Sequence, residues 1–321
     1  MMYAVFAAVA SVIVTMLTPA ILIPMDVKEE REPLVIVLEE QGPTVEEEIM
    51  IGLKTDRGIE EIPMEEYLIG VVLAEMPASF HLEALKAQAV AARTFAMSCL
   101  RTSKHSDCTV CAQSSCCQAW YSAETLEEKM GTAIEQYTHK VKQAVNQTRG
   151  EFLTYGGDLI EAVFFSCSGG KTEAAVAVWG NEVPYLQSVE SEGEENASKY
   201  ESKKIVPVDN FKSALRAYDK DLYFPKDPRL WIEDVKRTEG NGVDTITICG
   251  QQYTGRQIRE IFDLNSTVFE LTFEGENAVF CVKGHGHRVG MSQYGAEAMA
   301  KEGADYMQIL LHYYQNVSIE K

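Results

Sequence analysis

Basic residues are scarce in this sequence: 29 Lys and Arg stand against 48 Asp and Glu among 321 residues, which gives a formal net charge of -19 at pH 7. Such a charge repels a polyanion unless a local basic groove overcomes it, which argues against nucleic acid as a partner. An anionic substrate would need cations fixed in its own groove. The sequence also lacks an internal repeat of fixed period and a low-complexity tract, while its 46% hydrophobic content is that of an ordinary globular protein.

Charge is absent altogether from residues 1–24, a stretch long enough to cross the hydrocarbon of a bilayer as a helix. We interpret residues 1–25 as a transmembrane anchor. A cleavable signal peptide with a small-residue site near Ala20 is the alternative, but the apolar run continues past this residue and no Lys or Arg precedes it. Because this basic flank is missing, the sequence does not indicate which end of the predicted anchor faces the cytoplasm. Residues 26–48 are acidic and contain two prolines, which predicts a linker, and residues 49–321 are expected to form the globular domain.

One acidic residue, Glu75, ends an otherwise apolar run that stops at Pro77. Pro63 is well placed in a first helical turn, so the spacing predicts a helix over 64–76. Helical periodicity puts Glu75 on the apolar stripe, where burial and the negative end of the helix dipole both raise the pKa of a carboxyl group. Such a group suits a general acid for glycosidic bond cleavage. A helix-capping role or a structural ion pair with Arg93 is the alternative.

An alanine-rich segment at about 81–100 predicts the central packed helix of the domain, because alanine lets neighbouring backbones approach closely. Arg93 lies on its mostly apolar stripe, and a buried guanidinium must have partners. Those partners could be Glu75, a cluster of backbone carbonyls or a substrate carboxylate held in a two-pronged grip. Arg93 is the first candidate for a cation of the substrate groove, and Lys86 and Lys171 are weaker ones.

The cysteines are concentrated, because Cys108, Cys111, Cys116 and Cys117 fall in one window of ten residues. His105, Cys111 and Cys117 are spaced evenly by six, and three such ligands with a water or a further side chain would make a tetrahedral zinc site. Cys108 is the preferred substitute ligand, since adjacent cysteines seldom both bind one ion. A disulfide is an alternative for an extracytoplasmic chain. A thiol oxidoreductase would need a βαβ setting, which the sequence does not show.

Two glycine-containing segments are further candidates for binding. The segment "SCSGGKTE", residues 166–173, permits positive φ values and close approach to a ligand. In it, Ser168 either donates to sugar hydroxyls or caps the turn. The segment "KGHGHRVGMSQYGA", residues 283–296, opens a helix, a geometry that points backbone N–H groups at a bound group.

Four segments together resemble one known family. They are "YLIGVVLAEMPASFHLEALKAQAVAARTFA", "FFSCSGGKTE", "VWGNEVPYLQSV" and "GHGHRVGMSQYGAEAMAKEG", spread over residues 67–303. The sequence is similar in them to the stage II sporulation protein D (SpoIID) family. The resemblance implies a membrane-anchored lytic transglycosylase of peptidoglycan, acting when the mother cell of a spore-forming bacterium engulfs the forespore. It also implies that Glu75, in the family's EMP motif, is the catalytic acid and base.

The resemblance implies a metal site and one further functional residue. The histidine, the first cysteine and the double cysteine followed by "QAW" match the family's metal-binding loop, which implies His105, Cys111 and Cys117 as zinc ligands. A structural role for this zinc is favoured over a catalytic one, because cleavage by a lone acid needs no Lewis acid. Tyr185 matches a family position tied to function, while Gln187 stands where a lysine is common.

The resemblance also covers the glycine-punctuated loop near the end of the chain. His287, Ser292 and Gln293 match the family pattern, whereas His285 replaces an aromatic residue and Arg288 replaces a glycine. The expected substrate-binding residues are therefore Arg93, Tyr185, Ser168, Lys171, His287, Ser292 and Gln293.

A lytic transglycosylase breaks the β-1,4 bond between N-acetylmuramic acid and N-acetylglucosamine, and the sugar's own 6-hydroxyl closes a 1,6-anhydro ring. One carboxyl group can act first as acid and then as base, whereas a hydrolase usually needs two. The implied substrate is glycan stripped of its stem peptides by a partner amidase, at a site between the mother-cell and forespore membranes, with a membrane scaffold of the engulfment machinery as a further partner. A non-catalytic enhancer of an amidase is the alternative function.

The expected fold is α+β, with central alanine-rich helices packed with antiparallel strands that form a substrate groove, preceded by an N-terminal transmembrane helix. The pattern predicts one amphipathic helix over 122–147 and a hairpin with its turn at residues 156 and 157. Between residues 205 and 280 it predicts helices near 209–218 and 254–262, a strand near 244–249 and two more strands.

Overall fold

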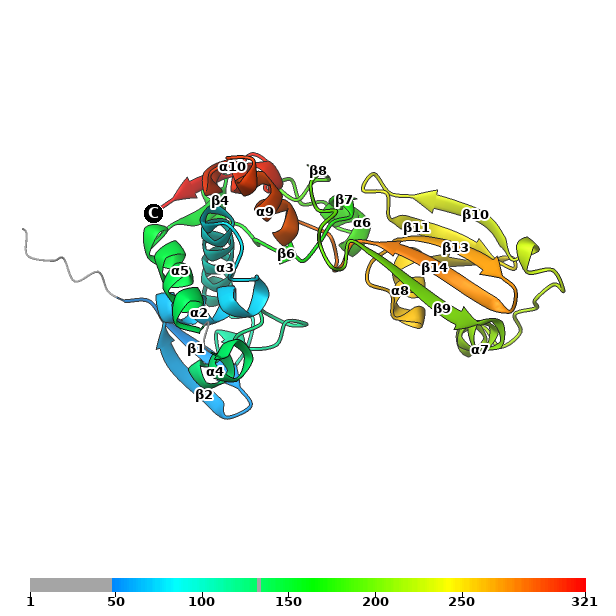
Figure 1. The fold of residues 1–321 in the computed structure, drawn as a ribbon, viewed down its shortest axis with the longest axis horizontal. Helices are drawn as coiled ribbons and strands as arrows, with labels where there is room; N and C mark the ends of the chain where they lie inside the picture. The colour runs from blue at the N-terminus through cyan, green and yellow to red at the C-terminus, as the bar shows by residue number, and fades with distance from the viewer. Residues whose placement is uncertain (1–47, 132–133) are drawn as a thin grey trace, which may run out of the picture. The chain divides into compact units, whose positions relative to one another are not determined.

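The computed structural model describes residues 48–131 and 134–321 (Figure 1). The expected transmembrane anchor at 1–25 and all but the last residue of the linker at 26–48 lie outside the described residues. Within the described part of the chain, no helix is both long and apolar enough to cross a membrane. Helices and strands are mixed along the chain, which confirms the α+β class.

The first part of the chain forms a small sheet and the two helices that position the site. β1 (Met50–Thr55) pairs antiparallel with β2 (Gly58–Pro63) and parallel with β3 (Val110–Cys111). The proline that ends β2 directly precedes α2 (Met64–Glu75), and its fixed φ suits a helix start. α3 (Leu82–Thr102) follows after a short turn. Both helices were predicted from the sequence, with bounds that differ by at most two residues.

α3 lies in the first hydrophobic core, where its small side chains allow close packing. It contacts α2, α5 (Ile134–Gln147), α9 (Gln293–Lys301) and α10 (Tyr306–Tyr313). Figure 1 shows α2 and α5 next to it. The fully buried alanines of α3 are Ala84, Ala87, Ala89, Ala91, Ala92 and Ala96. The prediction of a central, alanine-rich helix is confirmed.

The predicted single helix over 122–147 is wrong, because the structure divides it. α4 (Ala123–Met130) ends at Gly131, which has a φ of 52°. With its ψ of -130°, this positive φ is a non-helical conformation that glycine tolerates, and it ends the helix. α5 then starts separately and buries Val141 and Val145 in the first core. The amphipathic pattern continues across the glycine, so periodicity alone did not reveal the break.

The predicted hairpin is confirmed. β4 (Phe152–Tyr155) and β5 (Asp158–Leu159) are antiparallel, and φ is 60° at Gly156 and 86° at Gly157. Two successive positive φ values are what a tight two-residue hairpin turn needs. The last strand, β16 (Ser318–Glu320), pairs antiparallel with β4 and returns the end of the chain to the first core.

Short pairings bring the two glycine-containing segments together. β6 (Phe164–Phe165) is parallel to β15 (Met291–Ser292), and β7 (Gly170–Lys171) is antiparallel to β8 (Glu190–Ser191). Single bridges join Cys167 to His285 and Glu173 to Val289. The segment around Ser168 and the loop around His287, more than a hundred residues apart in sequence, therefore form one structural unit.

A second hydrophobic core lies within residues 201–283. One sheet has the order β13-β14-β9 and the other the order β10-β11-β12. The elements are β9 (Glu201–Pro207), α7 (Val208–Tyr218), β10 (Ile232–Arg237), β11 (Val243–Ile248), β12 (Gln251–Thr254), α8 (Gly255–Phe262), β13 (Val268–Glu274) and β14 (Asn277–Lys283). Phe211 of α7 lies at its centre, stacked on Phe262 at 5.0 Å and on Trp231 at 6.0 Å. The helices and strands predicted for this segment are confirmed.

Candidate active site

Glu75 is the last residue of α2, and the backbone becomes extended at Met76 before Pro77. Its side chain is partly buried, and Oε1 accepts a hydrogen bond of 2.6 Å from the backbone amide of Ala119. Burial raises the pKa of Glu75, while the Ala119 amide and the Gln293 side chain, by hydrogen bonding, oppose the rise. The niche therefore favours a bound proton and also provides donors for the anion that forms when the proton leaves.

A cleft of about 650 Å³ opens onto Glu75. Its walls come from the end of α2, the loop before α4, the strand β6, a segment before β9 and the two histidine positions of the loop before β15. Among the described residues that line it, Glu75 is the only carboxylate and Lys199 the only lysine or arginine. The other polar lining side chains are Ser114, Gln118, Tyr121, Ser166, Ser198, His285, His287, Gln293 and Tyr294.

His287 forms a neutral wall of the cleft. Burial is the main cause that lowers the pKa of His287 to about 4. Its Nδ1 accepts a hydrogen bond of 3.1 Å from the Val289 amide, so the ring proton is on Nε2, and the ring donates to the Phe164 carbonyl. The ring also packs against Phe165 and Trp179, with centroids 5.7 and 5.6 Å apart. These contacts fix the imidazole at neutral pH in one orientation.

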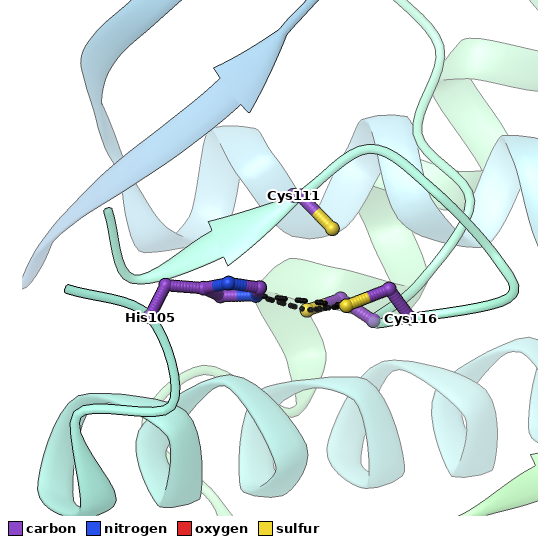
Figure 2. Close-up of side chains that lie close together, drawn as sticks. His105, Cys111 and Cys116 are labelled. Atoms are coloured by element: carbon purple, nitrogen blue, oxygen red, sulfur yellow. Dashed lines mark hydrogen bonds between the residues drawn. The ribbon is translucent and has the colours of Figure 1, made fainter. Parts of the chain in front are cut away.

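A cluster of thiols lies in the loop between α3 and α4. His105, Cys111, Cys116 and Cys117 offer ligand atoms that all lie within 4.8 Å of one another. Nε2 of His105 is 3.1 Å from Sγ of Cys117 and 3.8 Å from Sγ of Cys116, and these two sulfurs are 4.0 Å apart. Figure 2 shows His105, Cys111 and Cys116 converging from the loop and from β3. Zinc bound tetrahedrally at Zn–S distances of about 2.3 Å separates its sulfur ligands by about 3.8 Å, so the donor set fits zinc.

The fourth member of the cluster differs from the sequence-based expectation. Cys116 joins the three predicted ligands, whereas Cys108, the preferred substitute, is outside the cluster. The amides of Cys116 and Cys117 both donate to the carbonyl of Gln113, at 3.0 and 2.8 Å. This tight turn lets the two adjacent sulfurs approach the same point. All eight cysteines are free, so the structure does not support the disulfide alternative.

The thiol loop also supplies the amide that contacts the acid. Ala119, which donates to Glu75, lies two residues after the last thiol of the cluster. On one side of it, Oε1 of Gln118 accepts a hydrogen bond of 2.9 Å from the Tyr67 hydroxyl on α2. On the other side, the indole of Trp120 packs against the one glycine of α2, where any larger side chain would clash with it. The loop is therefore fixed to α2 on both sides of the amide.

Comparison with known proteins places the chain in a family. Residues 54–155 match the family model SpoIID, described as stage II sporulation protein. Stage II sporulation protein D of Bacillus subtilis (strain 168) is 38% identical over 270 residues, which cover 83% of this chain and 77% of that protein. The chain belongs to the stage II sporulation protein D family. The SpoIID protein of Bacillus amyloliquefaciens is 37% identical over 290 residues, covering 87% of this chain and 81% of that protein.

A more distant relative of this SpoIID family member has a different name. The amidase enhancer of Bacillus subtilis (strain 168) is 29% identical over 305 residues, which cover 78% of this chain and 40% of that protein. Family membership confirms the resemblance seen in the sequence motifs. It assigns the protein to a sporulation family.

Arg93 of this SpoIID family member, the first candidate for a cation of the substrate groove, lies in the core of the protein. Its side chain is 2% exposed. Nε and Nη2 donate to the two carboxyl oxygens of Glu65 at 3.0 and 2.7 Å, and the carbonyls of Val145 and Glu151 accept from Nη2 and Nη1. The guanidinium thus ties α2 and α5 to α3, and it neither lines the cleft nor contacts Glu75.

Ser168 and Ser292, two of the expected substrate-binding residues, also lie in the interior of the protein and outside the lining of the cleft. Both are fully buried. The hydroxyl of Ser168 donates to Glu194 at 2.9 Å and accepts from the Gly170 amide. The hydroxyl of Ser292 accepts from the Gly295 amide as the N-cap of α9. Ser168 therefore caps the turn, one of the two roles considered for it, and Ser292 positions Gln293 at the start of α9.

Glu194 is a buried carboxylate that no sequence motif indicates. It is 1% exposed and accepts hydrogen bonds from the Ser168 amide, the Gly169 amide, the Cys167 thiol and the Ser191 hydroxyl. These bonds fix the segment that leads from β6 to β7. Glu194 lies in an acid-rich stretch, "EGEEN", so nothing in the local pattern distinguishes it from its solvated neighbours.

Lys171 and Tyr185 lie outside the lining of the cleft, unlike His287 and Gln293. Nζ of Lys171 pairs with carboxylates of Glu190 at 3.2 Å and Glu239 at 3.8 Å. The hydroxyl of Tyr185 accepts a hydrogen bond of 3.1 Å from the Glu161 amide. Of the seven expected substrate-binding residues, His287 and Gln293 line the same cleft as Glu75.

Arg288 stands where the family pattern has a glycine, and its backbone conformation and buried contacts explain how an arginine fits there. It has a φ of 68°, the left-handed conformation that a glycine adopts without strain, which accounts for the glycine that is usual there. Its fully buried guanidinium pairs with Glu173 at 3.2 Å and donates to the carbonyls of Ser168, Lys171 and Gly240. These bonds offset the strained backbone and anchor the loop that carries His287.

Proposed function

We propose that this protein is a lytic transglycosylase that cleaves the bond between N-acetylmuramic acid and N-acetylglucosamine in peptidoglycan. The observation that carries the proposal is a lone carboxyl group, that of Glu75, partly buried in a cleft and in contact with a fixed amide donor. The chain belongs to the SpoIID family, and the resemblance of its motifs to that family implies peptidoglycan as the substrate class.

In the first step, protonated Glu75 donates its proton to the oxygen of the scissile glycosidic bond. The bond between C1 and this oxygen breaks, and positive charge develops at C1 and the ring oxygen. The raised pKa of Glu75 keeps a proton available for transfer. The amide of Ala119, already 2.6 Å from Oε1, then stabilises the carboxylate that remains.

In the second step, the same carboxylate accepts the proton of the 6-hydroxyl while that oxygen bonds to C1. The proton on Glu75 is thereby restored, a 1,6-anhydro ring forms, and no water is consumed. Hydrolysis usually uses a second carboxylate to activate water or to form a covalent intermediate. Among the described lining residues no second carboxylate exists, which favours the intramolecular route.

Two residues, His287 in the loop before β15 and Gln293 of α9, shape the site around this acid. Gln293, at the start of α9, hydrogen-bonds to Glu75 and favours its anionic form. His287 is a neutral ring held against Phe165 and Trp179, so it contributes a rigid wall without a second charge. Gln293 thus helps to hold the carboxyl group in place as its charge changes, while His287 keeps its part of the cleft wall uncharged.

The thiol cluster would hold a zinc ion with His105, Cys111, Cys116 and Cys117. Four protein ligands complete a tetrahedral shell, so zinc would supply structural stability to the loop and no open position for a reactant. The loop in turn holds the Ala119 amide against Glu75. The role proposed for the metal is therefore to position a donor of the acid.

The proposed setting follows from the family and from the N-terminal composition. Residues 1–24 carry no charge, which supports anchoring of the domain to a membrane by this segment. A sporulation function at the cell wall would place the domain outside the cytoplasm, between the mother-cell and forespore membranes, with an amidase and a membrane scaffold as partners. The similarity to an amidase enhancer supports the amidase.

The test uses the protein without residues 1–25, incubated with glycan strands from which the stem peptides have been removed. Mass spectrometry of the products is expected to show new 1,6-anhydro ends. The variant Glu75→Gln keeps the shape of the side chain but cannot donate the proton, and we expect it to produce none. Retained cleavage by this variant would refute the proposal.

A non-catalytic enhancer of an amidase is the second candidate, and the amidase-enhancer relative is the observation that favours it. The same preparations separate the two. Stimulation of an amidase that is equal for the wild type and Glu75→Gln, with no anhydro ends from either, would support the enhancer. Glu75-dependent anhydro ends support the transglycosylase.

A further inference from the structure

Lys199 is the single lysine or arginine among the described residues that line the cleft of Glu75. Its side chain is exposed, and Nζ lies 3.5 Å from Nε2 of His285, another lining residue. No carboxylate of the described residues forms an ion pair with it, whereas Lys86 and Lys171 are both paired with glutamates. The ammonium of Lys199 is therefore available to a ligand in the cleft.

The two histidines that line the cleft with Lys199 add no competing positive charge at neutral pH. Burial lowers the pKa of His285, and Lys199 and Arg259 lower it further. The pKa of His287 is about 4, mainly because of burial. Both imidazoles are thus neutral, and His285 can accept a hydrogen bond from the ammonium. Lys199 therefore supplies a positive charge to the cleft, although the protein as a whole has a net charge of -19.

The proposed substrate carries a matching negative charge only in one chemical form. Each muramic acid has a lactyl ether whose carbonyl is either in an amide bond to a stem peptide or free as a carboxylate. The amide is neutral at that position, and hydrolysis by an amidase creates the charge. A charge-assisted hydrogen bond to a carboxylate is about twice as strong as one to a neutral acceptor.

We infer that Lys199 is a specificity-determining residue that binds the lactyl carboxylate of muramic acid, with His285 as the residue that positions its ammonium. This assignment rests on the proposed function, and it gives one residue of the cleft the task of distinguishing glycan whose stem peptides have been removed from glycan that retains them. A lysine suits the task, because a flexible ammonium can follow a carboxylate on a rotatable ether without the fixed planar geometry of an arginine. The substrate would be the product of a reaction that cleaves the lactyl amide.

The experiment measures binding rather than cleavage. It uses the protein without residues 1–25 carrying Glu75→Gln, which leaves the strands intact. Two probes are compared: an alternating N-acetylglucosamine and N-acetylmuramic acid oligosaccharide with free lactyl carboxylates, and the same oligosaccharide with each carboxylate converted to a neutral methylamide. Lys199→Met and Lys199→Arg are made in this background. Lys220→Met, an exposed lysine outside the cleft lining, is the matched control for net charge.

We expect the background protein to bind the charged probe roughly tenfold more tightly than the neutral one, as a hydrogen bond to a charged group predicts. Lys199→Met should abolish this preference by weakening the charged probe alone, while Lys199→Arg and Lys220→Met should retain it. Equal weakening of both probes by Lys199→Met, an unchanged preference, or a preference lost equally in Lys220→Met would overturn the inference. Because cleavage is measured separately with active Glu75, a failure to form anhydro ends would refute the transglycosylase and leave the Lys199 result standing.

Discussion

The backbone amide of Ala119 donates a hydrogen bond of 2.6 Å to Oε1 of Glu75, across 44 positions of the sequence. This contact joins the acid at the end of α2 to the loop that carries the thiol cluster. A change in that loop can therefore reach the carboxyl group through this amide.

Cys116 is predicted to be a metal ligand, and Cys108 is not. Cys116→Ser should lower the zinc content of the purified protein, or weaken zinc binding, because it removes one of four donors that lie within 4.8 Å of one another. Cys108→Ser is the matched control from the same loop and should retain one zinc per chain. Metal analysis of both variants measures this, and equal metal content in the two would contradict the four-ligand site.

Glu75→Gln is predicted to be at least as stable as the wild type at neutral pH. The raised pKa of Glu75 means that the folded state holds the proton more tightly than the unfolded state does. Ionisation therefore costs folding free energy as the pH rises through the ordinary glutamate range and then through the raised pKa. The glutamine variant avoids this cost, so its stability advantage should grow with pH over that interval.

Denaturant unfolding of both proteins from acidic to neutral pH measures the difference. In acid, where Glu75 is protonated in both states, the advantage should vanish. A variant that loses stability relative to the wild type as the pH rises would show that the carboxylate is stabilised by the fold, and that the site does not favour its protonated form.

Arg93→Ala is predicted to unfold the protein more readily rather than to weaken glycan binding selectively. Removing one partner of a buried ion pair costs about 3–5 kcal/mol, because Glu65 would remain without its guanidinium. Arg101→Ala is the matched control: it breaks the exposed pair with Asp158 and should cost no more than about 1 kcal/mol. Equal small losses in thermal unfolding experiments, with a specific loss of glycan affinity for Arg93→Ala, would restore the substrate role.

The sequence predicted the features that depend on neighbours along the chain. The helical stripe placed Glu75 at a partly buried helix end, and the even spacing in the loop selected three members of the thiol cluster. The position of Glu75 follows from helical periodicity, and the cluster follows from residue spacing within a short loop. Both patterns can be read from a single sequence.

Other residues depended on contacts that local patterns do not contain. The apolar stripe showed that Arg93 needs partners but did not choose among them, and Glu65 lies 28 positions away. Ser168 was ambiguous until Glu194 was found to accept its hydroxyl. Lys199 was not singled out, because an exposed lysine in an acidic stretch has no local signal, and only the folded chain brings it to the same cleft as Glu75.

The central claim is that one carboxyl group performs both proton transfers and that no water enters the product. Cleavage of peptide-stripped glycan in water enriched in oxygen-18 tests this most directly, with mass spectrometry of the new chain ends. The account predicts 1,6-anhydro ends that carry no heavy oxygen. New reducing ends that each contain one oxygen-18 atom would show hydrolysis and would contradict it.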